Sequence, residues 1–156
     1  MARKLAEEIQ QKKPFRNPEA EAFLNLVRTA STLVRQLDRL LKPHGLTSTQ
    51  YNALRILRGA GEKGATCNDI AERLITNDPD VTRLLDRIEK SGLAERSRST
   101  ADRRVVVTKL TAQGASILRK LDREVDELHV RQFENLGRKE LATLIGQLEE
   151  IRSSAA

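Results

Sequence analysis

Residues 96–110, RSRSTADRRVVVTKL, decide the fold class of this chain, because they have the composition of a β-hairpin with an arginine-rich tip. Two short runs, residues 93–98 and the β-branched residues 105–108, flank a polar loop, as a hairpin requires. The segment 96–109 holds four arginines and one lysine against a single acidic residue, Asp102. Guanidinium groups gathered on a projecting loop suit phosphate oxygens and the narrow minor groove of DNA, and a solvated charged turn is the alternative interpretation.

Upstream of the hairpin, the sequence predicts a short helix that begins after Thr66. Thr66 is placed to cap the helix, and Asp69, three residues later, completes a near variant of the capping box. The apolar stripe of this helix is expected to consist of Ile70, Ala71 and Leu74.

A second helix is predicted from Asp78 and Pro79, because an N-cap residue followed by proline at the first helical position is a common helix start. Gly92 is suited to the position after its C-terminus, and Lys90 places a cation in the last turn. Its apolar face is Val81, Leu84, Leu85 and Ile88, and its polar face is Asp80, Thr82, Arg83, Asp86 and Arg87. The order helix, turn, helix, basic hairpin predicts a winged helix-turn-helix, in which the second helix lies in the major groove of DNA.

Long amphipathic helices are predicted on both sides of this portion. One apolar stripe with 3.6-residue spacing runs through residues 18–42 and ends at Pro43 and Gly45, and two more follow Thr111 and Gly137. These stripes need cover, which comes either from a second copy of the chain or from an intramolecular helical bundle. We therefore expect a mostly α fold (α+β), a winged helix-turn-helix with a two-stranded wing plus N- and C-terminal helices that form a dimerisation domain.

Three regions are expected: dimerisation helices in residues 1–46, a DNA-binding domain in 47–110 and further dimerisation helices in 111–156. Residues 1–13 are either a flexible arm or a short helix that latches onto the partner subunit. The net charge of +6 comes from the first two regions, since residues 111–156 hold seven basic and eight acidic side chains.

Composition argues against several other classes of protein. No long apolar run predicts a membrane span, no apolar stretch of a signal peptide follows the charged start, and a single cysteine cannot form an internal disulfide, so we expect a cytoplasmic protein. Two histidines, His44 and His129, are too few and too far apart to indicate a metal site. No nucleophile elbow or phosphate loop is present, so neither an enzyme nor a cofactor is expected.

Five segments resemble the MarR family of bacterial transcription regulators, in register from about residue 23 to residue 151. They are LTSTQY at 46–51, DIA at 69–71, VTRLLDRIEKSGL at 81–93, DRR at 102–104 and LTAQG at 110–114. The segment NDPD at 77–80 departs from the family pattern, because it is more acidic than the Ser- or Gln-rich start of the recognition helix that the resemblance implies. The resemblance also implies a two-fold dimer built from the N- and C-terminal helices.

Double-stranded DNA is therefore the expected partner. Two recognition helices in successive major grooves, about 34 Å apart, require a pseudo-palindromic operator of roughly 16 to 20 base pairs. The candidates for base edges are Asn77, Asp80, Val81 and Thr82, while Arg83 and Arg87 either contact DNA or pair with Asp86 or Asp69 to orient the helix. In the wing, Arg104 is the candidate for the minor groove with Asp102 holding it in position, and Arg98 and Arg103 are candidates for phosphate contacts.

The resemblance further implies small aromatic or phenolic acids as effectors, bound between the dimerisation helices and the winged helix. Arg28, His44 and Tyr51 are the candidates there, although Arg28 is equally interpreted as a surface charge and Tyr51 as a packed core ring. Some relatives sense peroxide through a cysteine in the first long helix, but that helix has none here. Cys67 is interpreted either as an incidental cysteine or as a thiol whose thiolate the helix N-terminus favours.

We thus expect a homodimeric, sequence-specific transcription regulator, a repressor of a nearby promoter whose DNA affinity is either set by a small ligand or constitutive. A non-specific architectural DNA-binding protein is one alternative. A helical protein-interaction module with a vestigial winged helix is another, which the acidic segment 77–80 would favour.

Overall fold

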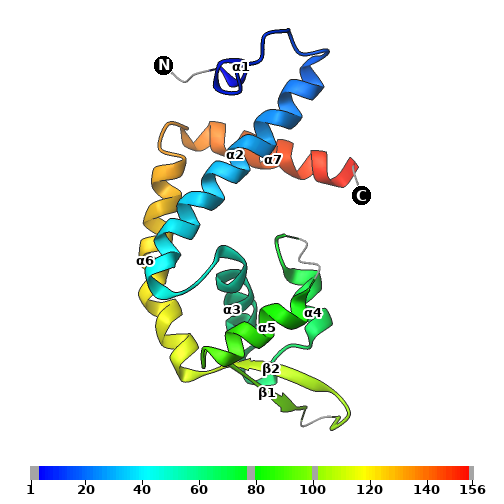
Figure 1. Cartoon of the computed structure of the whole chain (residues 1–156), viewed down its shortest axis with the longest axis vertical. Coiled ribbons are helices and arrows are strands. Elements are labelled where there is room, and N and C mark those ends of the chain that lie inside the picture. Colours follow the sequence, from blue (N-terminus) through cyan, green and yellow to red (C-terminus); the bar gives the residue numbers. More distant parts are fainter. Residues whose placement is uncertain (1–3, 77–79, 100–101, 155–156) are drawn as a thin grey trace. The chain divides into compact units, whose positions relative to one another are not determined.

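A computed structural model describes residues 4–76, 80–99 and 102–154 of the chain. The chain is mainly helical and folds as two compact units, Met1–Ser48 and Thr49–Ala156 (Figure 1). Within the described ranges, no helix is both long enough and apolar enough to cross a membrane.

The first unit consists of the short helix α1 (Leu5–Glu8), the long helix α2 (Pro18–Leu41) and the 3₁₀ helix η1 (Lys42–His44). The side chain of Asn17 caps α2 by accepting a hydrogen bond from the backbone N–H of Ala20 at 2.8 Å. Gly45, with φ of 70°, ends η1 in the left-handed region. The predicted helix over residues 18–42 and its termination are therefore confirmed.

Most of the apolar stripe of α2 remains exposed in the single chain. Leu41 is the one residue of α2 that is buried. Phe23, Val27 and Val34 are 63%, 52% and 41% exposed. An exposed phenylalanine and two exposed valines on one helix are unusual for a surface that meets only water. Most of the apolar side chains of this helix are therefore not buried by the described residues of the first unit.

The second unit contains three short helices, α3 (Ser48–Ala60), α4 (Cys67–Arg73) and α5 (Val81–Lys90), and the 3₁₀ helix η2 (Gly61–Lys63). Their shared core is aliphatic, as the low aromatic content requires. Its fully buried side chains are Leu54, Leu57, Ile70, Leu85 and Ile88.

Helix α4 begins with the predicted capping box. The Thr66 hydroxyl accepts from the backbone N–H of Asp69 at 3.1 Å, and the Asp69 carboxylate accepts from the N–H of Thr66 at 2.9 Å. The predicted apolar stripe is narrower than expected, because only Ile70 is buried and Ala71 is exposed. The helix ends at Arg73, so Leu74 follows in an extended conformation and is only partly buried.

Helix α5 begins two residues later than predicted. Its N-cap is Asp80, whose carboxylate accepts from the backbone N–H of Arg83 at 3.0 Å, and its first helical residue is Val81. The predicted cap Asp78 and the predicted first residue Pro79 lie outside the described residues. The predicted C-terminus is confirmed, since Gly92 follows the helix with φ of 71°.

The predicted hairpin is confirmed as strands β1 (Ala94–Arg98) and β2 (Val106–Leu110), which pair in antiparallel order and project from the helices (Figure 1). The register places Arg96 opposite Thr108. A further bridge joins Ala65 to Thr108 through two backbone hydrogen bonds of 2.8 and 3.0 Å. The base of the wing is thus tied to the segment that leads into α4.

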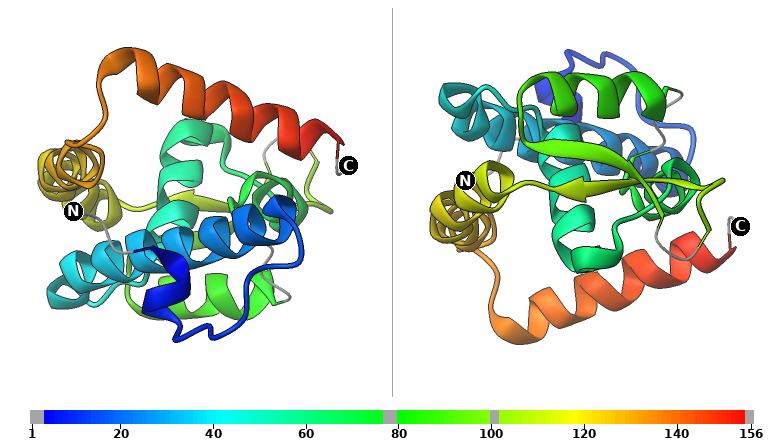
Figure 2. Two further views of the ribbon diagram at one scale, coloured as in Figure 1. Left: turned by 90° about the horizontal axis from the view of Figure 1, so that it is seen from above. Right: turned by 90° about the horizontal axis from the view of Figure 1, so that it is seen from below.

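Strand β2 leads into α6 (Ala112–Gln132), as the right-hand view of Figure 2 shows, and α7 (Arg138–Ser154) follows. The Thr111 side chain caps α6 by accepting from the N–H of Gly114 at 3.1 Å, and its hydroxyl donates to the carbonyl of Gly92 at 2.7 Å. Helix α6 buries Leu118, Leu121 and Val125, whereas α7 has no buried residue. The apolar stripe of α7 is therefore at most half-buried, with Ile145 and Ile151 exposed.

Candidate nucleic-acid interface

Helix α5 separates its two faces sharply, and this separation determines which side chains can meet a partner. Val81, Leu84, Leu85 and Ile88 are all buried, with exposures of 8%, 5%, 1% and 1%. On the opposite face Thr82, Arg83 and Arg87 are exposed. Because four buried side chains fix the rotation of the helix, this polar face has a defined direction.

The four predicted base-edge candidates differ in their surroundings. Val81 is buried in the core, which argues against a base contact, and Asn77 lies outside the described residues. Asp80 is half-buried and uses its carboxylate to cap α5 and to bind the Arg83 guanidinium, with Nε and Oδ2 3.0 Å apart. Thr82 lies on the exposed face, with its hydroxyl 3.8 Å from the Cys67 thiol.

The alternative role for the α5 arginines involves other partners than those predicted. Arg83 pairs with Asp80 rather than with Asp86 or Asp69, and 77% of its side chain is exposed. Asp69 is engaged in the capping box of α4, which holds the pKa of its carboxyl below the ordinary value, first through the Thr66 hydroxyl and then through the Thr66 backbone N–H. Arg87 is exposed on the same polar face as Arg83.

The tip of the wing is built around Asp102. Its carboxylate accepts from the backbone N–H of Arg104 at 2.9 Å and from the Arg104 guanidinium at 3.2 and 3.3 Å. These bonds, the backbone one first, hold the pKa of the Asp102 carboxyl below its ordinary value. The Arg104 side chain is nevertheless 92% exposed, so its remaining donors face outward.

The other wing arginines lie beside this turn. Arg98 donates from Nη1 to the backbone carbonyl of Arg103 at 2.8 Å, which closes the loop across its base, while the Arg103 side chain is exposed. Backbone bonds from Ser99 to Val105 at 2.8 Å and from Val105 to Asp102 at 2.9 Å complete the turn. The described residues of the tip thus present their guanidinium groups beside a set of internal hydrogen bonds.

Arg96 differs from the other wing arginines in a way that the sequence interpretation missed. Its guanidinium turns back onto α5, where Nη1 lies 2.6 Å from Oδ1 of Asp86 and 3.2 Å from Oε2 of Glu89. The pattern that could have revealed it is the pair of acidic residues three positions apart on the polar face of α5, opposite the first arginine of the hairpin.

The three effector candidates divide between the two units. Arg28 and His44 belong to the first unit, where the Arg28 guanidinium lies 3.4 Å from the Glu8 carboxylate and His44 is partly buried in η1. Tyr51 belongs to α3 in the second unit and is 5% exposed, with the Arg55 guanidinium 5.9 Å from its ring centroid. Burial is the main reason that the pKa of the Tyr51 phenol lies above its ordinary value.

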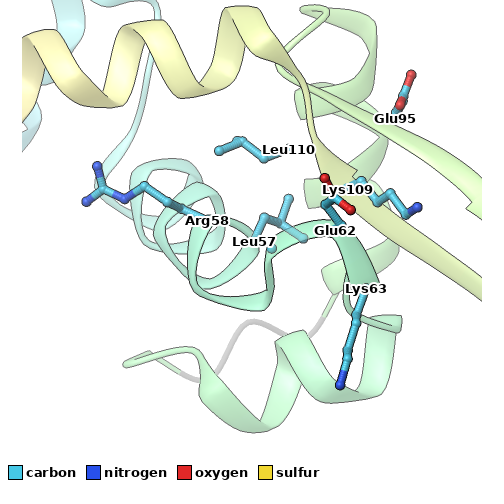
Figure 3. Close-up of a pocket in the computed structure, with 8 residues that line it drawn as sticks. Leu57, Arg58, Glu62, Lys63, Glu95, Lys109 and Leu110 are labelled. Atoms are coloured by element: carbon cyan, nitrogen blue, oxygen red, sulfur yellow. The ribbon is translucent and has the colours of Figure 1, made fainter.

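A hollow of about 590 Å³ lies where α3 and η2 meet the base of the wing (Figure 3). Arg58, Lys63, Glu95 and Lys109 line it, but their side chains point in different directions and do not converge on one point. Arg58 is also committed to Asp122 through bonds of 2.9 and 3.0 Å. In the described ranges, no three His, Cys, Asp or Glu side chains are placed to hold a metal ion.

Comparisons with known proteins agree with this geometry. The MarR family model matches residues 46–106, which include α3, α4, α5 and β1. The regulator FarR of Neisseria gonorrhoeae is 29% identical over 138 residues, 88% of this chain and 93% of that protein. The multiple antibiotic resistance protein MarR of Salmonella typhimurium is 35% identical over 118 residues, 75% of this chain and 81% of that protein. The crystal structure of a mutant MarR from E. coli complexed with operator DNA is 28% identical with a TM-score of 0.79, and covers 89% of this chain and 99% of that one.

Proposed function

Since the chain belongs to the MarR family of DNA-binding transcription regulators, which are not enzymes, we propose that it acts as a homodimeric repressor of a nearby promoter. Two copies related by a two-fold axis would place two α5 helices in successive major grooves about 34 Å apart. The operator would then be pseudo-palindromic and roughly 16 to 20 base pairs long.

One observation carries this proposal, namely that the exposed face of α5 and the exposed arginines of the wing belong to the same compact unit. We assign Thr82 to a base edge, since its hydroxyl is exposed next to the capped start of α5. Arg104 is assigned to the minor groove, because its side chain extends from the tip while Asp102 fixes its backbone. The further proposed contacts are Asp80, Arg83 and Arg87 on α5 and Arg98 and Arg103 on the wing.

Dimerisation through the terminal helices is proposed from the exposed apolar stripes of α2 and α7. Phe23 and Val27 on α2 and Ile145 and Ile151 on α7 are each about half exposed or more. Covering these side chains with the same helices of a second copy would remove apolar area from water, at about 25 cal/mol per Å². A dimer of this kind would present two equivalent reading heads to the two half-sites of a symmetric operator.

Release from DNA by a small aromatic or phenolic acid completes the proposal, with Arg28 and His44 of the first unit as the proposed contacts. Support comes from Arg28, whose guanidinium is matched to a carboxylate in the structure, that of Glu8. Benzoate and a hydroxybenzoate serve as probes, and each is expected to raise the melting temperature of the free protein. Arg28→Gln should abolish that rise.

The central test is a titration of the protein against a selected operator and a scrambled duplex at several salt concentrations. If each subunit neutralises about four to five phosphates, log K against log salt should fall with a slope of about −7 to −9. An architectural protein would bind both duplexes equally, and an interaction module would bind neither. Strong preference for the operator at physiological salt is the result that the proposal requires.

A further inference from the structure

We infer that Arg96, although it is one of the basic residues of the wing, does not contact DNA but is the positioning residue that fixes the wing relative to the recognition helix. The inference rests on the proposed assignment of α5 as reader and the wing as clamp. The inference adds one residue, Arg96, that holds α5 and the wing in a fixed relative position.

The contacts of Arg96 are all directed at α5. Its backbone N–H donates to Oε1 of Glu89 at 3.1 Å, and Nη1 donates to Oδ1 of Asp86 at 2.6 Å and to Oε2 of Glu89 at 3.2 Å. Nη2 donates to the backbone carbonyl of Thr82 at 3.3 Å. Its side chain is only 30% exposed, against 92% for Arg104 at the wing tip.

The spacing of the partners explains what these bonds do. Thr82, Asp86 and Glu89 lie at positions i, i+4 and i+7, so they form one stripe along about 10 Å of α5. A single ion pair would let the helix rotate about that point, whereas contacts along two turns fix its direction relative to β1. A planar guanidinium with five donors can do this, and the single ammonium group of a lysine cannot.

Charge distinguishes Arg96 from the contact arginines. Two carboxylates surround its guanidinium, so the cluster of Arg96, Asp86 and Glu89 carries a net negative charge. A cation already paired inside the protein displaces few counterions from DNA, because its field is neutralised before the phosphates arrive. Among the described residues, Arg98, two residues further along β1, donates to the backbone carbonyl of Arg103 and forms no ion pair, so its charge is not neutralised by any of them.

Strand β1 also connects Arg96 to the tip of the wing. Arg98 follows Arg96 on the same face of β1 and bonds to the carbonyl of Arg103, which adjoins the turn of Asp102 and Arg104. Removal of Arg96 should therefore loosen the tip without removing any of its side chains. The expected result is weaker binding with an unchanged number of phosphate contacts.

The experiment compares Arg96→Gln with the matched control Arg98→Gln, which removes the same charge two residues away. Operator affinity is measured by fluorescence anisotropy at four or more salt concentrations. We expect Arg96→Gln to weaken binding about tenfold with the salt slope unchanged. Arg98→Gln should make the slope shallower by about 0.9 per subunit. An equal loss of slope in both variants would overturn the inference.

Asp86→Asn provides a second test, because it removes a negative charge where Arg96→Gln removes a positive one. Removing a negative charge from a DNA-binding face would by itself strengthen binding, since it reduces repulsion of the phosphates. We expect weaker operator binding instead, because Arg96 loses its shortest partner. The double variant Arg96→Gln/Asp86→Asn should bind no more weakly than Arg96→Gln alone. Tighter binding by Asp86→Asn would contradict the positioning role.

Amide hydrogen exchange of the free protein tests the role of Arg96 without any operator DNA. Amides of β1 and β2 should exchange faster in Arg96→Gln and Asp86→Asn, while those of α3 stay protected and the circular dichroism is unchanged. Unaltered exchange in the wing of both variants would overturn the inference even if both bind DNA weakly. If the wild type itself fails to distinguish operator from scrambled DNA, the proposed function fails, and the exchange data still decide the role of Arg96.

Discussion

Thr82 and Arg104 differ in what they can read on DNA, and this difference makes their roles separable. Base edges in the major groove differ from one another in donors and acceptors, whereas phosphates and the minor groove carry little base identity. Thr82 is exposed on α5 and Arg104 on the wing tip, and neither side chain belongs to the core. Substitution of either one should therefore leave the fold intact.

We predict that Arg104→Ala weakens operator binding by about 1–3 kcal/mol and leaves the preferred major-groove bases unchanged. Thr82→Ala should lose preference at one or two symmetric positions and keep its affinity for random DNA. Selection of bound sequences for the wild type and both variants measures this. A motif that changes with Arg104→Ala but not with Thr82→Ala would reverse the assignment of reader and clamp.

The ion pair of Arg58 and Asp122 joins α3 to α6 and predicts a pH dependence. The hydrogen bond from Arg58 is the main reason that the pKa of the Asp122 carboxyl lies below its ordinary value of 3.8. As the pH falls below about 4, the unfolded chain takes up the proton first, so the stabilisation present above that pH is lost. Asp122→Asn should cost under about 1 kcal/mol at pH 7, because the pair is exposed, and almost nothing near pH 2. Urea unfolding at both pH values checks this, and an equal cost at both would argue against the pair.

Single residues also show where sequence reasoning reached its limit. The burial of Leu84, Leu85 and Ile88 followed from helical spacing alone, but Val81 satisfied both the apolar pattern and the position of a base contact. The role of Arg96 depends on a contact between a helix and a strand, which no local pattern contains. Residues whose partners lie on another element are therefore the ones that the sequence leaves open.

At the scale of elements, the start of α4, which has one possible N-cap residue, was predicted correctly. The start of α5, which has two possible N-cap residues, was not. Thr66 has its capping partner three residues on, which fixed the start of α4. Asp78 and Asp80 are both good N-caps, and local chemistry does not choose between them. In the structure the cap is Asp80, whose carboxylate accepts from the backbone N–H of Arg83, and Val81 is the first helical residue.

Gly114, at the junction between the wing and α6, and Gly146, in α7, predict opposite effects of substitution by alanine. A Cβ on Gly114 would overlap the carbonyl oxygen of Leu93, a backbone atom that cannot move away alone. Gly114→Ala should therefore destabilise the protein by about 1–3 kcal/mol. Gly146→Ala is the control in α7, where nothing lies within 4 Å, and it should stabilise the helix by about 0.5–1 kcal/mol. Thermal unfolding of both variants measures these changes in stability. A Gly114→Ala variant as stable as the wild type would show that the backbone near Leu93 can shift to accommodate the added Cβ.

At the scale of the whole molecule, periodicity predicted the helices but could not say what covers them. The sequence analysis assigned the stripes of residues 18–42 and of the C-terminal helix to a dimer interface or to an internal bundle. In the structure, α7 has no buried residue and α2 buries only Leu41, so most of both apolar stripes is not enclosed within the unit to which each helix belongs. The periodicity of one chain contains no information on a second copy, so the oligomeric state is a separate prediction.

We predict that Ile145→Glu weakens dimerisation without unfolding the chain, because this α7 side chain is 49% exposed in the monomer. In a dimer interface, a buried carboxylate would lack a partner and would cost several kcal/mol. Sedimentation equilibrium should give twice the 17.5 kDa chain mass for the wild type and an intermediate mass for the variant. Gln147→Glu adds the same charge at an exposed polar position and should remain a dimer. A wild type that is monomeric at micromolar concentration would remove both the interface and the half-site argument.

The bonded junction between the recognition helix and α6 has a mechanical consequence. Thr111 and Gly114 join the start of α6 to Gly92 and Leu93 without a flexible linker, and α6 continues for 21 residues, or about 30 Å. A displacement of about 3 Å at the far end of α6 corresponds to a rotation of about 5° at the junction. We therefore expect a small displacement of the distal end of α6 to reach the recognition helix as a rotation at this junction.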